Sequence, residues 1–262
     1  MKEHFEIIDF HTHPFLSEVY SICWHNEYCN FSPNQTLKTL QSLGVKKICG
    51  SVLSNEVCEK GRGWELVSKW NNHALQVKEQ YGDFYEMGFH VHPDFVSESL
   101  EEIDRMAERG VKLVGELVPA MTGYSGFAVS GMKKIIDYAT QKKMIISLHT
   151  TENEDMEQFV SWFPDTKIVA AHPGEYERLM EHISRMKRYP NYYLDISGYG
   201  ILRQGALRHI IDEVGVERIL FGSDFPTCNA GMFVGGVLLD DLLTDSEREM
   251  IFSKNAKRLL NL

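Results

Sequence analysis

Two histidines spaced by one residue stand at the end of an apolar run near the N-terminus. The stretch EIIDFHTHPF, residues 6 to 15, is typical of a β-strand as far as His11 and His13. Side chains alternate across a strand, so both imidazoles project to one side, with Asp9 below them. Converging imidazole nitrogens are good ligands for zinc and related divalent cations. The pair predicts a metal site only if other ligands join it, because His-X-His also occurs among ordinary surface residues.

The composition is that of an ordinary globular protein. Of 262 residues, 43% are hydrophobic and 24% charged, and the formal net charge is -10. This negative charge argues against a general affinity for nucleic acid or for an anionic membrane surface. No run approaches the ~18 uninterrupted apolar residues of a membrane span, and the start MKEHFE lacks the apolar core of a signal peptide. We therefore expect a cytoplasmic protein that acts on a small molecule.

The cysteines do not suggest a disulfide framework or a zinc-thiolate site. There are five of them, an odd number, and none forms a Cys-X-X-Cys pair. Reduced thiols are expected in a cytoplasmic protein. The five positions are Cys23, Cys29, Cys49, Cys58 and Cys228.

Eight apolar runs rich in Val and Ile predict eight strands, and several are apolar on both faces, as buried parallel strands are. Segments with helical spacing separate them, including 33–44, 97–110, 130–143 and 205–215. A βα unit repeated eight times predicts an α/β fold, a (β/α)8 TIM barrel in a single domain over residues 1–262. A flavodoxin-like or doubly wound sheet is the alternative. The expected strands are 5–11, 45–54, 84–91, 111–118, 144–150, 167–172, 192–198 and 218–225.

Residues of metal-ligand type stand where five of these runs stop. In a barrel of this kind the active site lies at the carboxyl ends of the strands, so a polar residue there is a functional candidate. Any one of these residues is explained equally well as a polar cap on a strand. Together they predict a metal centre formed by His11, His13, Glu116, His149, His172 and Asp224.

The same residues carry a resemblance to a known family. His-X-His on the first strand, an acidic residue on the fourth, His on the fifth and sixth and Asp on the eighth resemble the amidohydrolase superfamily of metal-dependent barrels. The blocks AAHPG, LDISGYG, ERILFGSDFP and IFSKNAKRLL are similar to its amidohydrolase-2 branch. That branch includes hydrolases and nonoxidative decarboxylases such as aminocarboxymuconate semialdehyde decarboxylase. Glu116 departs from many decarboxylases and is more like the TatD-type hydrolases, in which a fourth-strand Glu contacts metal.

The resemblance implies one or two divalent cations, with zinc expected first and manganese as the alternative. A cation held by neutral histidines and one or two carboxylates lowers the pKa of a bound water to about 7. Asp224 would then accept the proton of that water, and His172 would bind a second cation or steady the developing oxyanion. We expect hydrolysis of a small amide, ester or lactone, one that also carries a carboxylate. The alternative is a metal-dependent decarboxylase, in which the acid-base residue protonates the carbon that loses carbon dioxide.

Residues that would contact the substrate are harder to find. Arg62 and Arg203, in loops after the second and seventh strands, are candidates for a substrate carboxylate because a guanidinium pairs with such a group bidentately. Tyr124 and Tyr199, beside loop glycines, are candidates to line the pocket. His92 follows His90 with the same spacing as the first pair, and either packs in a loop or contacts substrate.

One long connection after the first strand is rich in aromatic residues. It covers residues 14–35. Two roles fit it equally well: a lid over the site, or a surface that packs against a second subunit in a homo-oligomer.

Overall fold

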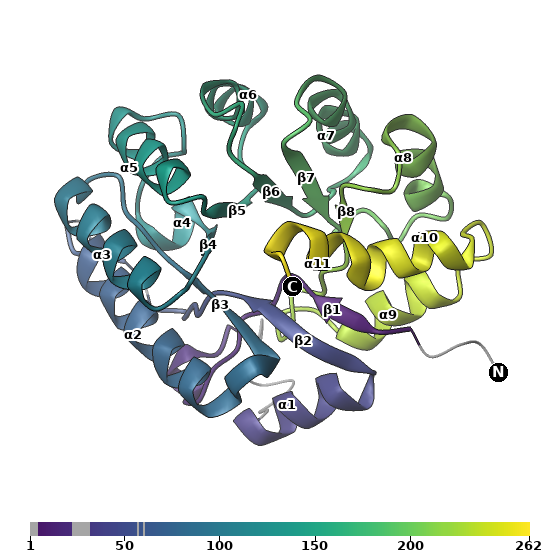
Figure 1. Ribbon diagram of the computed structural model, residues 1–262, viewed down its shortest axis with the longest axis horizontal. Helices are drawn as coiled ribbons and strands as arrows, with labels where there is room; N and C mark the ends of the chain where they lie inside the picture. Colours follow the sequence, from purple (N-terminus) through teal and green to yellow (C-terminus); the bar gives the residue numbers. More distant parts are fainter. Residues whose placement is uncertain (1–4, 23–31, 57, 60) are drawn as a thin grey trace.

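Eight parallel strands lie side by side in chain order, from β1 to β8. The computed structural model describes residues 5–22, 32–56, 58–59 and 61–262, and Figure 1 shows the strands as a ring surrounded by helices. The strands are β1 (Ile7–Asp9), β2 (Val45–Gly50), β3 (Tyr85–Phe89), β4 (Leu113–Leu117), β5 (Ile145–His149), β6 (Ile168–Ala171), β7 (Tyr192–Asp195) and β8 (Ile219–Leu220).

Backbone hydrogen bonds join the first strand to the last and close the ring. Phe10 N–H donates to the carbonyl of Phe221 at 2.8 Å, and a parallel bridge pairs Thr12 with Phe225. The N–H of Asp224 donates to the carbonyl of His11, also at 2.8 Å. The predicted (β/α)8 barrel is therefore confirmed, and the doubly wound alternative is wrong because that fold reverses its strand order. The seam also brings His11 next to Asp224.

Helices follow the strands around the outside of the ring (Figure 1). The expected helical segments form α1 (Pro33–Ser42), α3 (Val96–Glu108), α5 (Ser130–Gln141) and α8 (Ala206–Val214). The others are α2 (Gly63–Tyr81), α4 (Pro119–Thr122), α6 (Asn153–Trp162), α7 (Tyr176–Arg188), α9 (Ala230–Leu238), α10 (Asp245–Glu249) and α11 (Asn255–Leu260). Short turns of helix lie at Glu18–Tyr20, Gly82–Phe84 and Met250–Lys254. Within the described ranges, no helix has the length and apolar character that a membrane crossing requires.

The apolar core has two layers. The larger one packs between the strands and the surrounding helices. The smaller one fills the ring itself, with one or two side chains from the segments of β1, β2, β4, β5, β6 and β8 and three from α11. Leu113 and Ile145, which begin β4 and β5, belong to this inner layer. In Figure 1, α11 lies across the middle of the ring, so this helix closes the amino-terminal end of the barrel and leaves the carboxyl end for the site.

Several strands end earlier than expected. β6 stops at Ala171 and β8 at Leu220, although the apolar runs continue to His172 and Phe225. His172 and Asp224 have positive φ angles, 68° and 56°, which extended strands do not accommodate. The backbone therefore leaves the sheet where the candidate ligands lie.

Two expectations fall partly on residues that are not described. Residues 23–31 of the 14–35 connection lie outside the described part of the chain, so its role as a lid or subunit contact stays a prediction. Cys23 and Cys29 lie in the same stretch, whereas Cys49, Cys58 and Cys228 are free thiols.

Candidate metal centre

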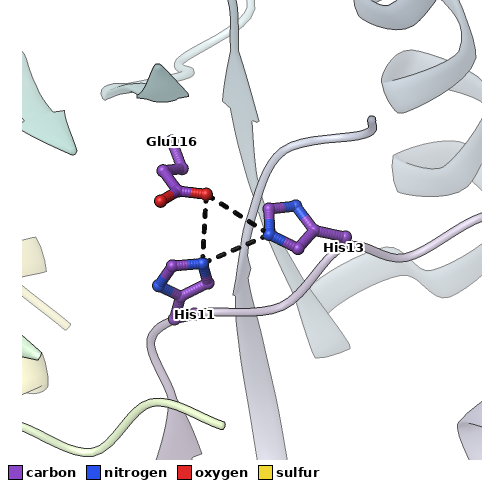
Figure 2. A group of neighbouring side chains, drawn as sticks. All are labelled: His11, His13 and Glu116. Carbon is purple, nitrogen blue, oxygen red and sulfur yellow. Dashed lines mark hydrogen bonds and ion pairs between the residues drawn. The ribbon is translucent and has the colours of Figure 1, made fainter. Parts of the chain in front are cut away.

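His11, His13 and Glu116 form a tight group at the carboxyl end of the barrel (Figure 2). The Nε2 atoms of His11 and His13 lie 3.2 Å apart, and Glu116 Oε2 lies 3.2 Å from the first and 3.4 Å from the second. All three side chains are buried. Two ring nitrogens and one carboxylate oxygen therefore converge on one point.

The Nδ1 atom of each ring, which points away from this group, is hydrogen-bonded to an acceptor. His11 Nδ1 donates to Asp195 Oδ2 at 3.0 Å, and His13 Nδ1 donates to the carbonyl of Ser51 at 2.9 Å. In the neutral imidazole this leaves both Nε2 atoms without a hydrogen, so two lone pairs and a carboxylate oxygen face each other in a buried space. Such a donor set repels itself unless a cation or a proton lies within it, and it therefore fits a divalent metal ion.

A second group shares the same carboxylate. The other oxygen of Glu116, Oε1, lies 3.0 Å from His149 Nδ1 and 3.7 Å from His172 Nε2. These three side chains also meet the spacing of a metal site. The second group is more open than the first, because the side chain of His149 is 43% exposed. Glu116 thus faces two pairs of histidines, one with each oxygen.

Asp224 lies beside the first group. Its Oδ1 is 3.3 Å from His13 Nε2 and 3.7 Å from His11 Nε2, and its side chain is 12% exposed. The structure therefore brings together all six side chains that the sequence nominates as metal ligands. Their role as ligands stays a prediction.

Asp195 and Ser197, which the sequence pattern alone does not nominate, connect the two groups. Ser197 Oγ lies 3.0 Å from His11 Nδ1 and 3.1 Å from His172 Nδ1, and it also bonds to Asp195 Oδ1. Both residues are buried. A signal for Asp195 was present, because it is an acidic residue within the seventh apolar run, 192–198. Ser197 carries no comparable signal, since a single serine after a strand is common.

Without a cation, protons compensate the carboxylates of the site. Burial alone would lower the pKa of His13, but hydrogen bonds with Asp224 and Glu116 outweigh it and raise this pKa to about 9. The pKa of His11 is likewise raised against the effect of burial, by Glu116 and Asp195. Burial would raise the pKa of Glu116, yet the neighbouring His11 holds it well below its usual range. Protons and metal ions should therefore compete for the same nitrogens.

The five residues nominated as substrate contacts are dispersed. Arg62 is half exposed and forms ion pairs with Glu59 and Glu65 on its own segment. Arg203 is exposed and lies 3.4 Å from Glu175. A substrate carboxylate would have to displace these carboxylates. Both arginines stay predictions.

Of the remaining three, Tyr199 is 72% exposed, whereas His92 and Tyr124 are buried and pack edge to face. His92 Nε2 donates to the carbonyl of Thr122, and its Nδ1 accepts from the N–H of Asp94, so both ring nitrogens are occupied. The hydroxyl of Tyr124 is buried without a hydrogen-bond partner in the described ranges.

Space for a small molecule lies beside the segment that follows β5. A cavity of about 360 Å³ lies between the loop before α5 and the segment that leads into α6, and one of its lining residues, Thr151, is two residues after His149. The lining residues are Ser125, Gly126, Ala128, Val129, Thr151, Glu152, Glu154, Asp155 and Gln158. This volume lies within the range of small-molecule sites, roughly 300 to 1,000 Å³.

Comparison with known proteins gives a family match and several similar folds. A family model described as Amidohydrolase matches residues 8–262. A 2,6-dihydroxybenzoate decarboxylase from Rhizobium has 15% identity and a TM-score of 0.73, with 98% of each chain covered. A dihydroxybenzoic acid decarboxylase from Polaromonas sp. JS666, solved with bound manganese and 2-nitroresorcinol, has 14% identity and a TM-score of 0.74, covering 98% of this chain and 97% of that one. A putative amidohydrolase from Staphylococcus aureus has 19% identity and a TM-score of 0.72, covering 98% and 100%. No curated protein gives a significant match.

Proposed function

Because this chain belongs to the amidohydrolase family, we propose that it is a metal-dependent hydrolase of a small amide, ester or lactone. The observation that carries the proposal is the position of Glu116. Its two carboxylate oxygens face separate pairs of histidines, His11 with His13 and His149 with His172. A shared carboxylate of this kind suits two divalent cations, an arrangement that metal-dependent hydrolases use. Zinc suits this set of imidazoles and carboxylates, and manganese is the alternative.

Cations held by these residues would supply Lewis acidity, which polarises a carbonyl group and lowers the pKa of a water molecule. Side chains of the protein would carry out the proton transfers and stabilise the developing charge. Asp224, at the mouth of the first group, is placed to accept a proton at Oδ1 and to return it to the leaving group. His172 Nδ1 is held by Ser197, so its Nε2 points toward Glu116 and is placed to bind a cation or stabilise an oxyanion. The burial of His11 and His13 keeps bulk water away from the inner side of the site.

A decarboxylase is the second candidate. The titles of several similar structures name decarboxylases of aromatic acids, two of them with bound manganese. The same ligands would then hold an acidic substrate, and Asp224 would deliver a proton to the carbon that loses carbon dioxide. Glu116 argues for the hydrolase, because a single cation needs no carboxylate shared between two histidine pairs.

Metal content and product analysis test these proposals. Elemental analysis of the purified protein should find close to two divalent ions per chain, and His11→Ala with His13→Ala should remove metal while the barrel stays folded. Full metal retention in the double variant would overturn the ligand assignment. A screen of esters, lactones, amides and aromatic carboxylates then separates the two reactions. A hydrolase consumes water and releases an acid, whereas release of carbon dioxide without loss of water identifies the decarboxylase.

A further inference from the structure

A buried chain of polar groups lies behind the second histidine pair. It runs from Tyr192 on β7 to His182 on α7, then to Thr150, which follows β5, and ends at the carbonyl of Ala171 on β6. Tyr192 Oη lies 2.8 Å from His182 Nδ1, and His182 Nε2 lies 3.4 Å from Thr150 Oγ1. Thr150 Oγ1 donates to the carbonyl of Ala171. Tyr192 and His182 are fully buried.

The donor and the acceptor of each hydrogen bond in this series of polar groups can be assigned. Thr150 uses its hydrogen on the carbonyl of Ala171, so its oxygen can only accept from His182, which must carry its hydrogen on Nε2. His182 Nδ1 is then an acceptor for the hydroxyl of Tyr192. Burial, reinforced by Arg185 and Arg178, lowers the pKa of His182 to about 3, so the ring is neutral as this order requires. Asp195 and the backbone of His172 act in the opposite sense.

The series of polar groups ends at two residues that are adjacent in sequence to candidate ligands. Thr150 directly follows His149, and Ala171 directly precedes His172. The regular pairing of β5 with β6 ends at His149 and Ala171. The hydroxyl of Thr150 therefore adds one more link between the two segments, at the point where the positive φ of His172 turns the backbone out of the sheet.

The second pair needs such support more than the first. His11 and His13 are buried and each is held through Nδ1 by an acceptor behind the ring. His149 is 43% exposed, and within the described ranges the hydrogen-bond partner of its ring is Glu116, a side chain that is itself part of the centre. Ser197 holds the ring of His172, and backbone anchors on either side of the pair are a second means by which the fold can fix it.

We propose that His182, acting through Thr150, is a positioning residue that holds His149 and His172 in place to bind a metal ion. This inference rests on the proposed metal-dependent function. Neither residue touches the centre directly, and each acts on a ligand through the backbone. Loss of such supporting contacts typically lowers metal affinity by about 10- to 100-fold.

The test compares metal retention in four single variants of the full chain. Thr150→Val removes the hydroxyl and keeps the shape, Tyr192→Phe removes the far end of the chain, and Thr150→Ser restores the hydroxyl. Thr140→Val is the matched control, because Thr140 also donates to a backbone carbonyl and contacts a second hydroxyl, that of Thr166, beneath the barrel. Each zinc-loaded protein is dialysed against graded concentrations of a chelator, and bound zinc is measured by elemental analysis alongside the thermal midpoint.

We expect Thr150→Val and Tyr192→Phe to release zinc at roughly 10-fold or more lower chelator concentration, and Thr150→Ser and Thr140→Val to follow the wild type. Equal retention in Thr150→Val and Thr140→Val would overturn the inference, even if both lose thermal stability. If Thr150→Val does not fold, Tyr192→Phe against Thr140→Val decides by the same criterion. A wild-type protein that retains no zinc and no manganese would overturn the proposed function itself, and the inference with it.

Discussion

Gly198 leaves no room for a side chain next to His172. A β-carbon at position 198 would lie 2.4 Å from Nδ1 of the His172 ring, much closer than real contacts allow. Gly198 also has a φ of +65°, a region that side chains disfavour. The orientation of His172 thus depends on the absence of a β-carbon at position 198, in the loop after β7.

Gly198→Ala should displace His172 and weaken metal binding by about tenfold or more, as loss of a supporting contact does. Gly110→Ala is the control, because Gly110 has a similar φ of +76° and open space where the β-carbon would be. Both variants should lose about 1 kcal/mol of stability from the strained backbone. Metal retention measured against a chelator separates them, and equal retention in the two variants would show that His172 does not bind metal in this orientation.

Asp195→Asn should loosen the first histidine pair. The amide would keep the size of the side chain but remove the charge that accepts the hydrogen of His11 Nδ1. Metal affinity should fall by about 10- to 100-fold with little change in the overall fold. Asp212→Asn, on the exposed face of α8, where Asp212 pairs with Arg208, is the control. An unchanged affinity in Asp195→Asn would mean that the charge of Asp195 is not needed to orient His11.

Asp224→Asn should separate catalysis from metal binding. The amide keeps one oxygen near His13 but cannot accept a proton as the carboxylate does. Turnover per bound metal ion should fall by roughly 10²- to 10⁴-fold, the span for a lost general base. The rate is measured on the substrate that the screen identifies and is normalised to metal content. A wild-type rate in the metal-loaded variant would exclude Asp224 from proton transfer.

The metal-free protein should lose stability as the pH rises above about 6.5. The folded-state pKa of His13 is raised to about 9, above the ordinary value of 6.5. Its proton therefore stabilises the fold fully below pH 6.5, and this contribution disappears as the pH passes 9, by about 1.4 kcal/mol per pH unit. Urea unfolding of chelator-treated protein at pH 6.5, 8 and 9 measures the effect against His13→Gln, which should show a flatter profile. Parallel profiles for the two proteins would contradict the assignment.

Metal uptake should release protons for the same reason. A cation that binds His13 Nε2 must displace the proton that this nitrogen carries below pH 9. Calorimetric titration with zinc in buffers of different ionisation enthalpy counts the protons released, and the wild type should release about one more than His13→Gln at pH 7. No difference between the two would indicate that His13 is already neutral.

The sequence was informative where chemistry and periodicity coincided. The runs that end at His11, Glu116 and His149 could be read as strands with polar ends, because a buried parallel strand is apolar on both faces. The role of the arginines was harder to predict, because a loop position alone does not show whether the guanidinium is already paired. Arg62, for example, forms ion pairs with Glu59 and Glu65, three residues away on either side. Contacts between distant segments, such as His182 with Thr150, leave no local pattern and had to come from the structure.

The seam between the first and last strands has a consequence for biosynthesis. His11 and Asp224 are separated by most of the chain, yet the hydrogen bond from the N–H of Asp224 to the carbonyl of His11 is part of what closes the ring. A nascent chain on the ribosome can therefore carry both histidine pairs and Glu116 without a finished centre. Only after translation has passed β8 can the complete set of side chains come together, so binding of the proposed metal ions would be a late step, coupled to the final folding of the barrel.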